Sequence, residues 1–159
     1  SPKENGGTSS NVLAHLDEWM IAHQPDIVHL NCGLHDIKRP FDTQILQTSF
    51  EIYEKNLRTI LSRLQSETDA KIVFALTTPV SYARHHANKD FDRYEEDVQR
   101  VNDIARYVTD ELSIPVDDLY KIVMQAGRDD ILLPDGVHYT SQGYELLAHQ
   151  VASVISPLL

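Results

Sequence analysis

Residues 71–77 read Lys-Ile-Val-Phe-Ala-Leu-Thr, with an unbroken apolar run from Ile72 to Leu76. A strand with one solvated face alternates apolar and polar residues, whereas a continuous apolar run predicts a strand that is buried on both faces. Such strands are typical of parallel sheets that helices cover on both sides. The stretch therefore predicts an α/β fold.

Strand and helix patterns alternate outward from this stretch. A short apolar strand precedes it at residues 26–31, and a brief third strand follows at residues 114–117. Apolar residues at helical spacing predict helices at about residues 11–23, 44–66, 91–112, 120–126 and 141–155. Because helices separate the strands, we expect parallel pairing with right-handed crossovers in a doubly wound, three-layer α/β/α sheet.

Local signals define the ends and faces of these helices. Ser10 is expected to cap the first helix, and Thr140 or Ser141 the last one. Residues 79–90 carry turn chemistry, and we expect residues 82–86 to form a mobile loop beside a substrate crevice. The buried stripe expected for the 44–66 helix is Ile45, Leu46, Ile52, Leu57, Ile60, Leu61 and Leu64.

Length and composition limit the classes of function. The 159 residues suit one domain, spanning 1–159, and 14 Lys and Arg against 24 Asp and Glu give a formal charge of −10. This charge would repel a phosphate backbone, so we expect no nucleic-acid partner. No apolar run is long enough to span a membrane, and the single Cys32 has no disulfide partner and leaves the cellular compartment open.

The turn Asp135-Gly136-Val137-His138 is the strongest chemical signal in the sequence. Ligand sites of doubly wound sheets lie beyond the carboxyl ends of the strands, and this turn belongs to one of the loops expected there. A three-residue offset in a tight turn lets the Asp135 carboxylate reach the His138 ring. A carboxylate on one ring nitrogen makes the other nitrogen a better general base. The alternative is a helix-entry loop in which Asp135 only forms the turn.

Two further segments carry groups that could stabilise an oxyanion. Gly7, followed by Thr8 and Ser9, leads into a helix amino terminus, where backbone N–H groups are free. The segment at residues 31–36 ends the first strand, where Asn31 or His35 could present a side-chain donor. The alternative for the first segment is an ordinary Ser-capped helix start.

Together these segments resemble the SGNH, or GDSL-type, hydrolase family over nearly the whole chain. Residues 7–9 resemble its second block, residues 33–36 its Gly-x-Asn-Asp third block, and residues 135–138 its fifth block. The resemblance implies a flavodoxin-like fold and a serine esterase that needs no cofactor. It implies Asp135 as the orienting acid, His138 as the general base, and Gly7 and His35 as oxyanion donors.

The chain departs from the family pattern in two places. His35 stands where the family has asparagine; a neutral imidazole donates one hydrogen bond, and Asn31 is an alternative donor. The first block, a strand followed by Gly-Asp-Ser with the nucleophilic serine, does not occur in the 159 residues. We therefore expect two strands and the serine upstream of Ser1, in a separated fragment, a separate chain or residues outside this sequence. Residues 26–31 would then form an unpaired sheet edge.

These observations leave two functions open. The first is hydrolysis of a small acyl ester, including a carbohydrate O-acetyl group, through an acyl-enzyme. The second is a non-catalytic binding module on the same scaffold. Cys32 is expected to be buried packing at a strand end rather than a nucleophile. His85, His86, Asp90 and Asp92 are poorly spaced for a metal, and we expect no metal site.

Overall fold

The computed structural model describes residues 5–159, and residues 1–4 of the predicted domain lie outside the described part. Its centre is a parallel sheet of β1 (Ile27–Leu30), β3 (Lys71–Ala75) and β5 (Val116–Asp117), in the order β1-β3-β5. Ile27 lies opposite Lys71, and Phe74 lies opposite Val116. The predicted parallel α/β arrangement is confirmed.

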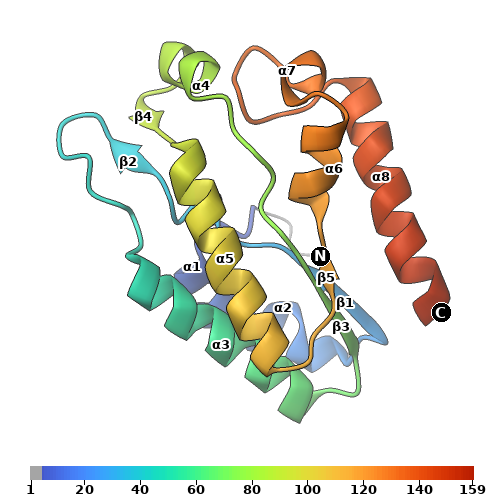
Figure 1. Ribbon diagram of the computed structural model, residues 1–159. Helices are drawn as coiled ribbons and strands as arrows, with labels where there is room; N and C mark the ends of the chain where they lie inside the picture. Colours follow the sequence, from blue (N-terminus) through green and yellow to red (C-terminus); the bar gives the residue numbers. More distant parts are fainter. Residues whose placement is uncertain (1–4) are drawn as a thin grey trace.

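Helices cover both faces of this sheet (Figure 1). One face carries α1 (Ser9–Ala14), α2 (Leu16–Trp19), α3 (Phe50–Glu67) and α5 (Glu95–Glu111), and the other carries α6 (Leu119–Gln125) and α8 (Ser141–Ile155). The centre of β3 is fully buried, as its apolar run predicts. Leu57 and Leu61 of α3 and Val101 and Val108 of α5 belong to the same buried core.

Shorter elements lie at the carboxyl end of the strands. β2 (Arg39–Pro40) pairs antiparallel with β4 (Phe91–Asp92), and α4 (Tyr82–Asn88) and α7 (Arg128–Ile131) lie near them at the same end (Figure 1). Two 3₁₀ turns, η1 (Ile21–His23) and η2 (Ser156–Leu158), complete the elements. The segments that follow the strands therefore build one end of the molecule.

The first predicted helix is broken into α1, α2 and η1. Its cap is Thr8 rather than the predicted Ser10, and the Thr8 side chain accepts a hydrogen bond from the Asn11 backbone. Ser10 already lies inside α1, and its Oγ accepts a hydrogen bond from Asn56. The apolar spacing thus predicted helical structure here but not the breaks at His15 and Met20.

The predicted 44–66 helix begins at Phe50, with Ser49 as its cap. Gln44 has a left-handed φ of 53°, which interrupts a helix. Ile45 and Ile52 are 69% and 50% exposed, so their place in the buried stripe was wrong. Leu57, Ile60, Leu61 and Leu64 are buried as predicted.

Two other predictions about the same end of the molecule were wrong in detail. Residues 82–88 form the helix α4 instead of a loop, and residues 91–92 form β4 ahead of α5.

The last helix, α8, begins at Ser141 with Thr140 as its cap, as predicted. Within residues 5–159, no helix combines the length and apolar character that crossing a membrane requires.

β1 is an edge of the sheet, as predicted for residues 26–31. Among the described residues, it pairs with β3 alone. Its other edge carries backbone N–H and C=O groups that a further strand could pair with.

Candidate functional site

The turn at residues 132–140 holds its shape through local backbone hydrogen bonds. The Leu133 N–H donates to the His138 carbonyl at 2.8 Å, and the Gly136 N–H donates to the Leu133 carbonyl at 3.0 Å. Gly136 has a φ of +76°, which side chains with a Cβ rarely adopt. The Pro-Asp-Gly sequence thus fixes a compact loop that brings Asp135 and His138 together.

Asp135 and His138 form the predicted pair. Asp135 Oδ2 lies 2.5 Å from His138 Nδ1, and Asp135 Oδ1 accepts backbone hydrogen bonds from Val137 at 3.2 Å and His138 at 3.0 Å. Partial burial alone would raise the pKa of Asp135, but these hydrogen bonds hold it well below its usual range. Lys89 Nζ lies 3.3 Å from Oδ2 and adds a favourable charge.

The Asp135 contact leaves the other nitrogen of the His138 ring available. Among the described residues, none forms a hydrogen bond to His138 Nε2, and the side chain is 59% exposed. A carboxylate on Nδ1 favours the tautomer whose Nε2 accepts a proton. The geometry is that of a general base with its orienting acid.

Helix α4 and its cap residue Ser81 pack against this turn and hydrogen-bond to it. The Ser81 N–H donates to the Gly136 carbonyl at 2.9 Å, and Asn88 Nδ2 donates to the Pro134 carbonyl at 3.0 Å. A Cβ on Gly136 would lie 2.6 Å from the Ser81 carbonyl oxygen and 2.7 Å from the His85 nitrogen. The sequence analysis missed this support because it interpreted residues 82–86 as a loop.

Gly7 lies directly ahead of helix α1. It has a φ of +68°, and its N–H donates to Asn5 Oδ1 at 2.9 Å. The Gly7 N–H therefore points away from helix α1, and its acceptor in the structure is the side-chain oxygen of Asn5.

A buried network joins the Gly7 segment to the loop after β1. Asp36, 1% exposed, accepts hydrogen bonds from the Ser9 backbone at 2.9 Å and from Ser9 Oγ at 2.6 Å. Asn56 of α3 donates to Ser9 Oγ at 3.1 Å. Burial raises the pKa of Asp36, and the Ser9 hydrogen bonds offset part of that rise. Two of the three predicted segments are thus tied together.

His35 and Asn31 lie on this same segment with different partners. The His35 side chain is partly buried, and the pKa of its ring is lowered by burial first and by the charges of Arg93 and Lys38 second. Asn31 is exposed and donates one amide hydrogen bond to the Ala75 carbonyl of β3 at 2.7 Å. One of the two amide hydrogens of Asn31 therefore serves the sheet.

Cys32 is buried at the strand end, as predicted. It is 4% exposed, and burial first and the Asp36 charge second raise the pKa of its thiol. Its carbonyl accepts a hydrogen bond from Tyr53 at 3.1 Å. A thiol that resists ionisation is a poor nucleophile.

The two adjacent histidines do not form a metal cluster. His85 is buried, whereas His86 Nδ1 lies 2.7 Å from Asp92 Oδ1. Within residues 5–159, no group of three or more His, Cys, Asp or Glu side chains is arranged to hold a metal ion.

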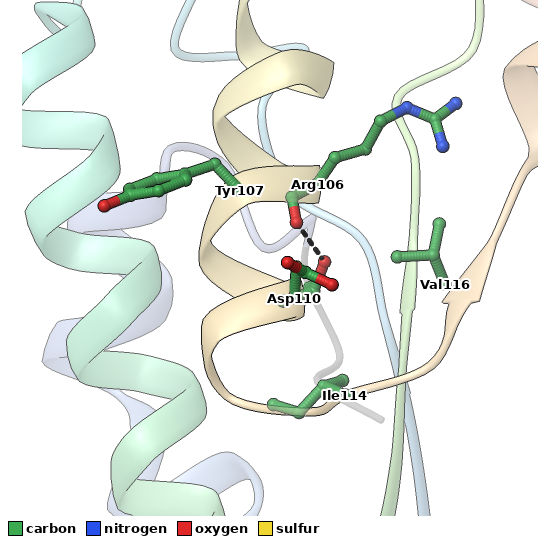
Figure 2. Close-up of a pocket in the computed structure, with 6 residues that line it drawn as sticks. Arg106, Tyr107, Asp110, Ile114 and Val116 are labelled. Atoms are coloured by element: carbon green, nitrogen blue, oxygen red, sulfur yellow. Dashed lines mark hydrogen bonds between the residues drawn. The ribbon is translucent and has the colours of Figure 1, made fainter.

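A hollow of about 450 Å³ lies away from these loops, between α5 and β5 (Figure 2). Ile114 and Val116, which line it, mark the amino end of β5. Figure 2 shows Arg106 and Tyr107 pointing to opposite sides of α5. Because ligands of doubly wound sheets bind beyond the carboxyl ends of the strands, this hollow is separate from the Asp135–His138 site.

Several solved structures share the fold of this chain. No curated protein matches the chain in sequence. The lipase/acylhydrolase from Enterococcus faecalis is similar with a TM-score of 0.78 and 25% identity, over 94% of this chain and 71% of that one. A GDSL-like lipase from Bacteroides thetaiotaomicron gives 0.73 and 20%, over 98% and 74%. A catalytic serine-to-alanine mutant of an acetylxylan esterase from Geobacillus stearothermophilus gives 0.78 and 17%, over 95% and 68%.

The sequence pattern of one protein family matches most of the chain. The match runs over residues 4–146 and includes the Gly7 segment, the 33–36 loop and the Asp135–His138 turn. The chain belongs to the GDSL-like lipase/acylhydrolase family.

Proposed function

We propose that the protein is a serine esterase that hydrolyses small acyl esters, including O-acetyl groups on carbohydrates. The observation that carries the proposal is the Asp135–His138 pair, with Oδ2 2.5 Å from Nδ1 and Nε2 directed away from it. Membership of an acylhydrolase family supports ester hydrolysis as the reaction class. The structural similarity to acetylxylan esterases supports an acetyl group as the acyl part of the substrate and a carbohydrate as its alcohol part.

The reaction proceeds through an acyl-enzyme. A serine Oγ attacks the ester carbonyl carbon while His138 Nε2 takes the hydroxyl proton. The C–O bond to the alcohol then breaks, and His138 returns the proton to the leaving oxygen. Water repeats the attack on the acyl-serine, with His138 as base again, and releases the carboxylic acid. Asp135 holds the His138 ring throughout and stabilises its positive charge.

Gly7 and His35 stabilise the oxyanion in this proposal. The Gly7 N–H donates to Asn5 Oδ1 in the structure, so it serves as the first donor only when an oxyanion takes the place of that oxygen. Substrate then displaces the Asn5 side chain. His35 is the second donor in this proposal, and Asn31, which gives one of its two amide hydrogens to the Ala75 carbonyl, is the alternative donor.

We place the nucleophilic serine in a segment upstream of Ser1. Ser9, which follows Gly7 closely, donates its hydroxyl to Asp36 and accepts from Asn56, so both its hydrogen-bonding roles are filled. Within residues 5–159 no strand pairs with the outer edge of β1, which supports an additional strand there that would carry the serine to the carboxyl end of the sheet. The serine-to-alanine change in the related catalytic mutant supports serine as the residue type.

Labelling with a serine-directed fluorophosphonate tests the proposal. The full-length protein should hydrolyse p-nitrophenyl acetate and carry the label on a serine upstream of Ser1, and His138→Ala should abolish both. The 159-residue chain alone should be no faster than its own His138→Ala variant. A label within residues 1–159 would overturn the placement of the nucleophile. A full-length protein that neither hydrolyses esters nor takes the label would overturn the esterase and favour a binding module.

A further inference from the structure

Arg93 is a buried cation that the proposed reaction does not use. It lies between β4 and α5, at the end of the molecule that carries the His138 turn, and is only 4% exposed. Burial lowers its pKa to about 10, and the negative charge of Asp135 offsets part of that change. The guanidinium therefore stays charged at neutral pH.

The partners of Arg93 come from both sides of the site. Its Nε donates to the Leu34 carbonyl at 2.7 Å, directly before His35. Its Nη1 lies 3.3 Å from His85 Nε2, and because a guanidinium only donates, the His85 nitrogen must accept. The guanidinium carbon also lies 4.9 Å from the centre of the Phe91 ring.

The His85 contact leads directly to the catalytic turn. The backbone nitrogen of His85 lies under Gly136, where an added Cβ would approach it to 2.7 Å. His85 is fully buried, and burial first and Arg93 second lower the pKa of its ring to about 4, so the ring is neutral. Arg93 thus contacts both the loop that carries His35 and His85, whose backbone packs against the turn that carries His138.

The charge of Arg93 is not cancelled by a neighbouring carboxylate. Across residues 5–159, no Asp or Glu oxygen lies within 4.0 Å of its nitrogen atoms. Asp135 is the carboxylate whose charge acts on it, and it does so from beyond ion-pair distance. A buried charge without a close partner is costly to fold around, which a purely structural role explains poorly.

We propose that Arg93 is a positioning residue of the esterase site, which fixes the loop that presents His35 and supplies a positive potential that favours the oxyanion. This inference rests on the proposed function. The charged groups acting on the His35 ring are Arg93 and Lys38, and both are cations. A neutral imidazole can polarise a carbonyl oxygen through its single N–H.

The transition state should feel this arrangement more than the ground state. Negative charge develops on the carbonyl oxygen only as the tetrahedral intermediate forms. A preorganised positive potential therefore lowers the activation barrier of the chemical step and has little effect on substrate binding. Loss of the guanidinium should therefore reduce kcat and leave KM nearly unchanged.

The test compares Arg93→Met, Arg93→Lys and the control Arg106→Met in the full-length protein. Arg106 lies on helix α5, which follows Arg93 in the chain, and lines the hollow at the other end of the sheet. Arg93→Met should lower kcat for p-nitrophenyl acetate about 10- to 100-fold with KM within about threefold. Arg93→Lys keeps the charge and should recover part of kcat, and Arg106→Met should behave as wild type.

A second readout is independent of catalysis. The His35 ring, assigned in NMR spectra with a His35→Gln variant, should titrate at higher pH in Arg93→Met than in wild type, and close to wild type in Arg93→Lys. Wild-type kcat together with an unchanged His35 titration in a folded Arg93→Met protein overturns the inference. If Arg93→Met does not fold, a wild-type kcat and KM in Arg93→Lys overturns the fixing of the loop by the guanidinium. If the wild type hydrolyses no ester, the proposed function fails, and the titration still decides whether Arg93 controls His35.

Discussion

Replacing Asp135 by Asn tests the catalytic pair at one atom. Asp135 Oδ1 accepts the backbone hydrogen bonds of Val137 and His138, and an asparagine oxygen can keep both. Asp135 Oδ2 faces His138 Nδ1 at 2.5 Å, and this position would become an NH₂ group, which donates. The ring must then present an unprotonated Nδ1 and carry its proton on Nε2.

That change of tautomer removes the base while the turn remains. A protonated Nε2 cannot take the proton of the serine hydroxyl, and the loss of this function in a triad is about 10⁴-fold in kcat. The corresponding rise in barrier is about 5.5 kcal/mol. KM should change little, because the substrate contacts of the ground state are untouched.

The assay is steady-state hydrolysis of p-nitrophenyl acetate by the protein with its proposed upstream segment and by its Asp135→Asn variant. Asp129→Asn is the matched control, because Asp129 is an exposed carboxylate of the adjacent helix α7 that pairs with Arg128. A kcat for Asp135→Asn within about tenfold of wild type, with the fold intact, would refute the role of Asp135 as the orienting acid.

The same substitution has a signature in acid stability. The folded protein holds the pKa of Asp135 below its usual value, so in acid the unfolded chain binds more protons at this group. The free energy of unfolding then rises with pH through this range: the contribution is present above the unfolded pKa and is lost as pH falls through the folded one. Urea denaturation should show the advantage of wild type over Asp135→Asn shrinking in acid, and a constant difference would contradict the linkage.

Three further predictions concern packing around the site. Gly136→Ala should lower the free energy of unfolding by about 2–4 kcal/mol, from the left-handed backbone and the 2.6 Å approach to the Ser81 oxygen, as measured by urea denaturation. Cys32 should react with Ellman's reagent about 100-fold more slowly in the native protein than in urea, and rapid native labelling would contradict its burial. Gln150→Met should cost about 1–3 kcal/mol, because it removes the donor at 2.8 Å from buried Asp117 Oδ1; an unchanged urea midpoint would show that another group satisfies that oxygen.

The sequence predicted those parts of the fold that depend on neighbouring residues. The apolar run of β3 identified a strand buried on both faces, because burial there follows from residue type alone. The Asp135–His138 pair was predictable because the two residues are three positions apart and the intervening Gly136 permits the turn. Thr140 as the cap of α8 is of the same kind.

Features that depend on distant residues could not be predicted in this way. The left-handed Gln44, at the start of the predicted 44–66 helix, is held by Asp92 and Tyr94, which lie 48 and 50 residues further along the chain. The Arg93 contact with the Leu34 carbonyl spans 59 residues, and a single arginine ahead of a helix carries no pattern that marks it. Such contacts follow from the folded arrangement, not from any local spacing.

The described residues assemble the site by joining locally formed pieces through buried polar side chains. Asp36 joins the Gly7 segment to the loop after β1 through the backbone and hydroxyl of Ser9. Arg93 joins that loop to His85, which lies beneath the His138 turn. Each link is buried, so breaking one leaves an unpaired polar group that the structure must move to satisfy. Substitutions at Asp36 and Arg93 should therefore reduce catalysis by displacing the proposed oxyanion donors and the proposed base His138 relative to one another, even though neither side chain needs to touch the substrate.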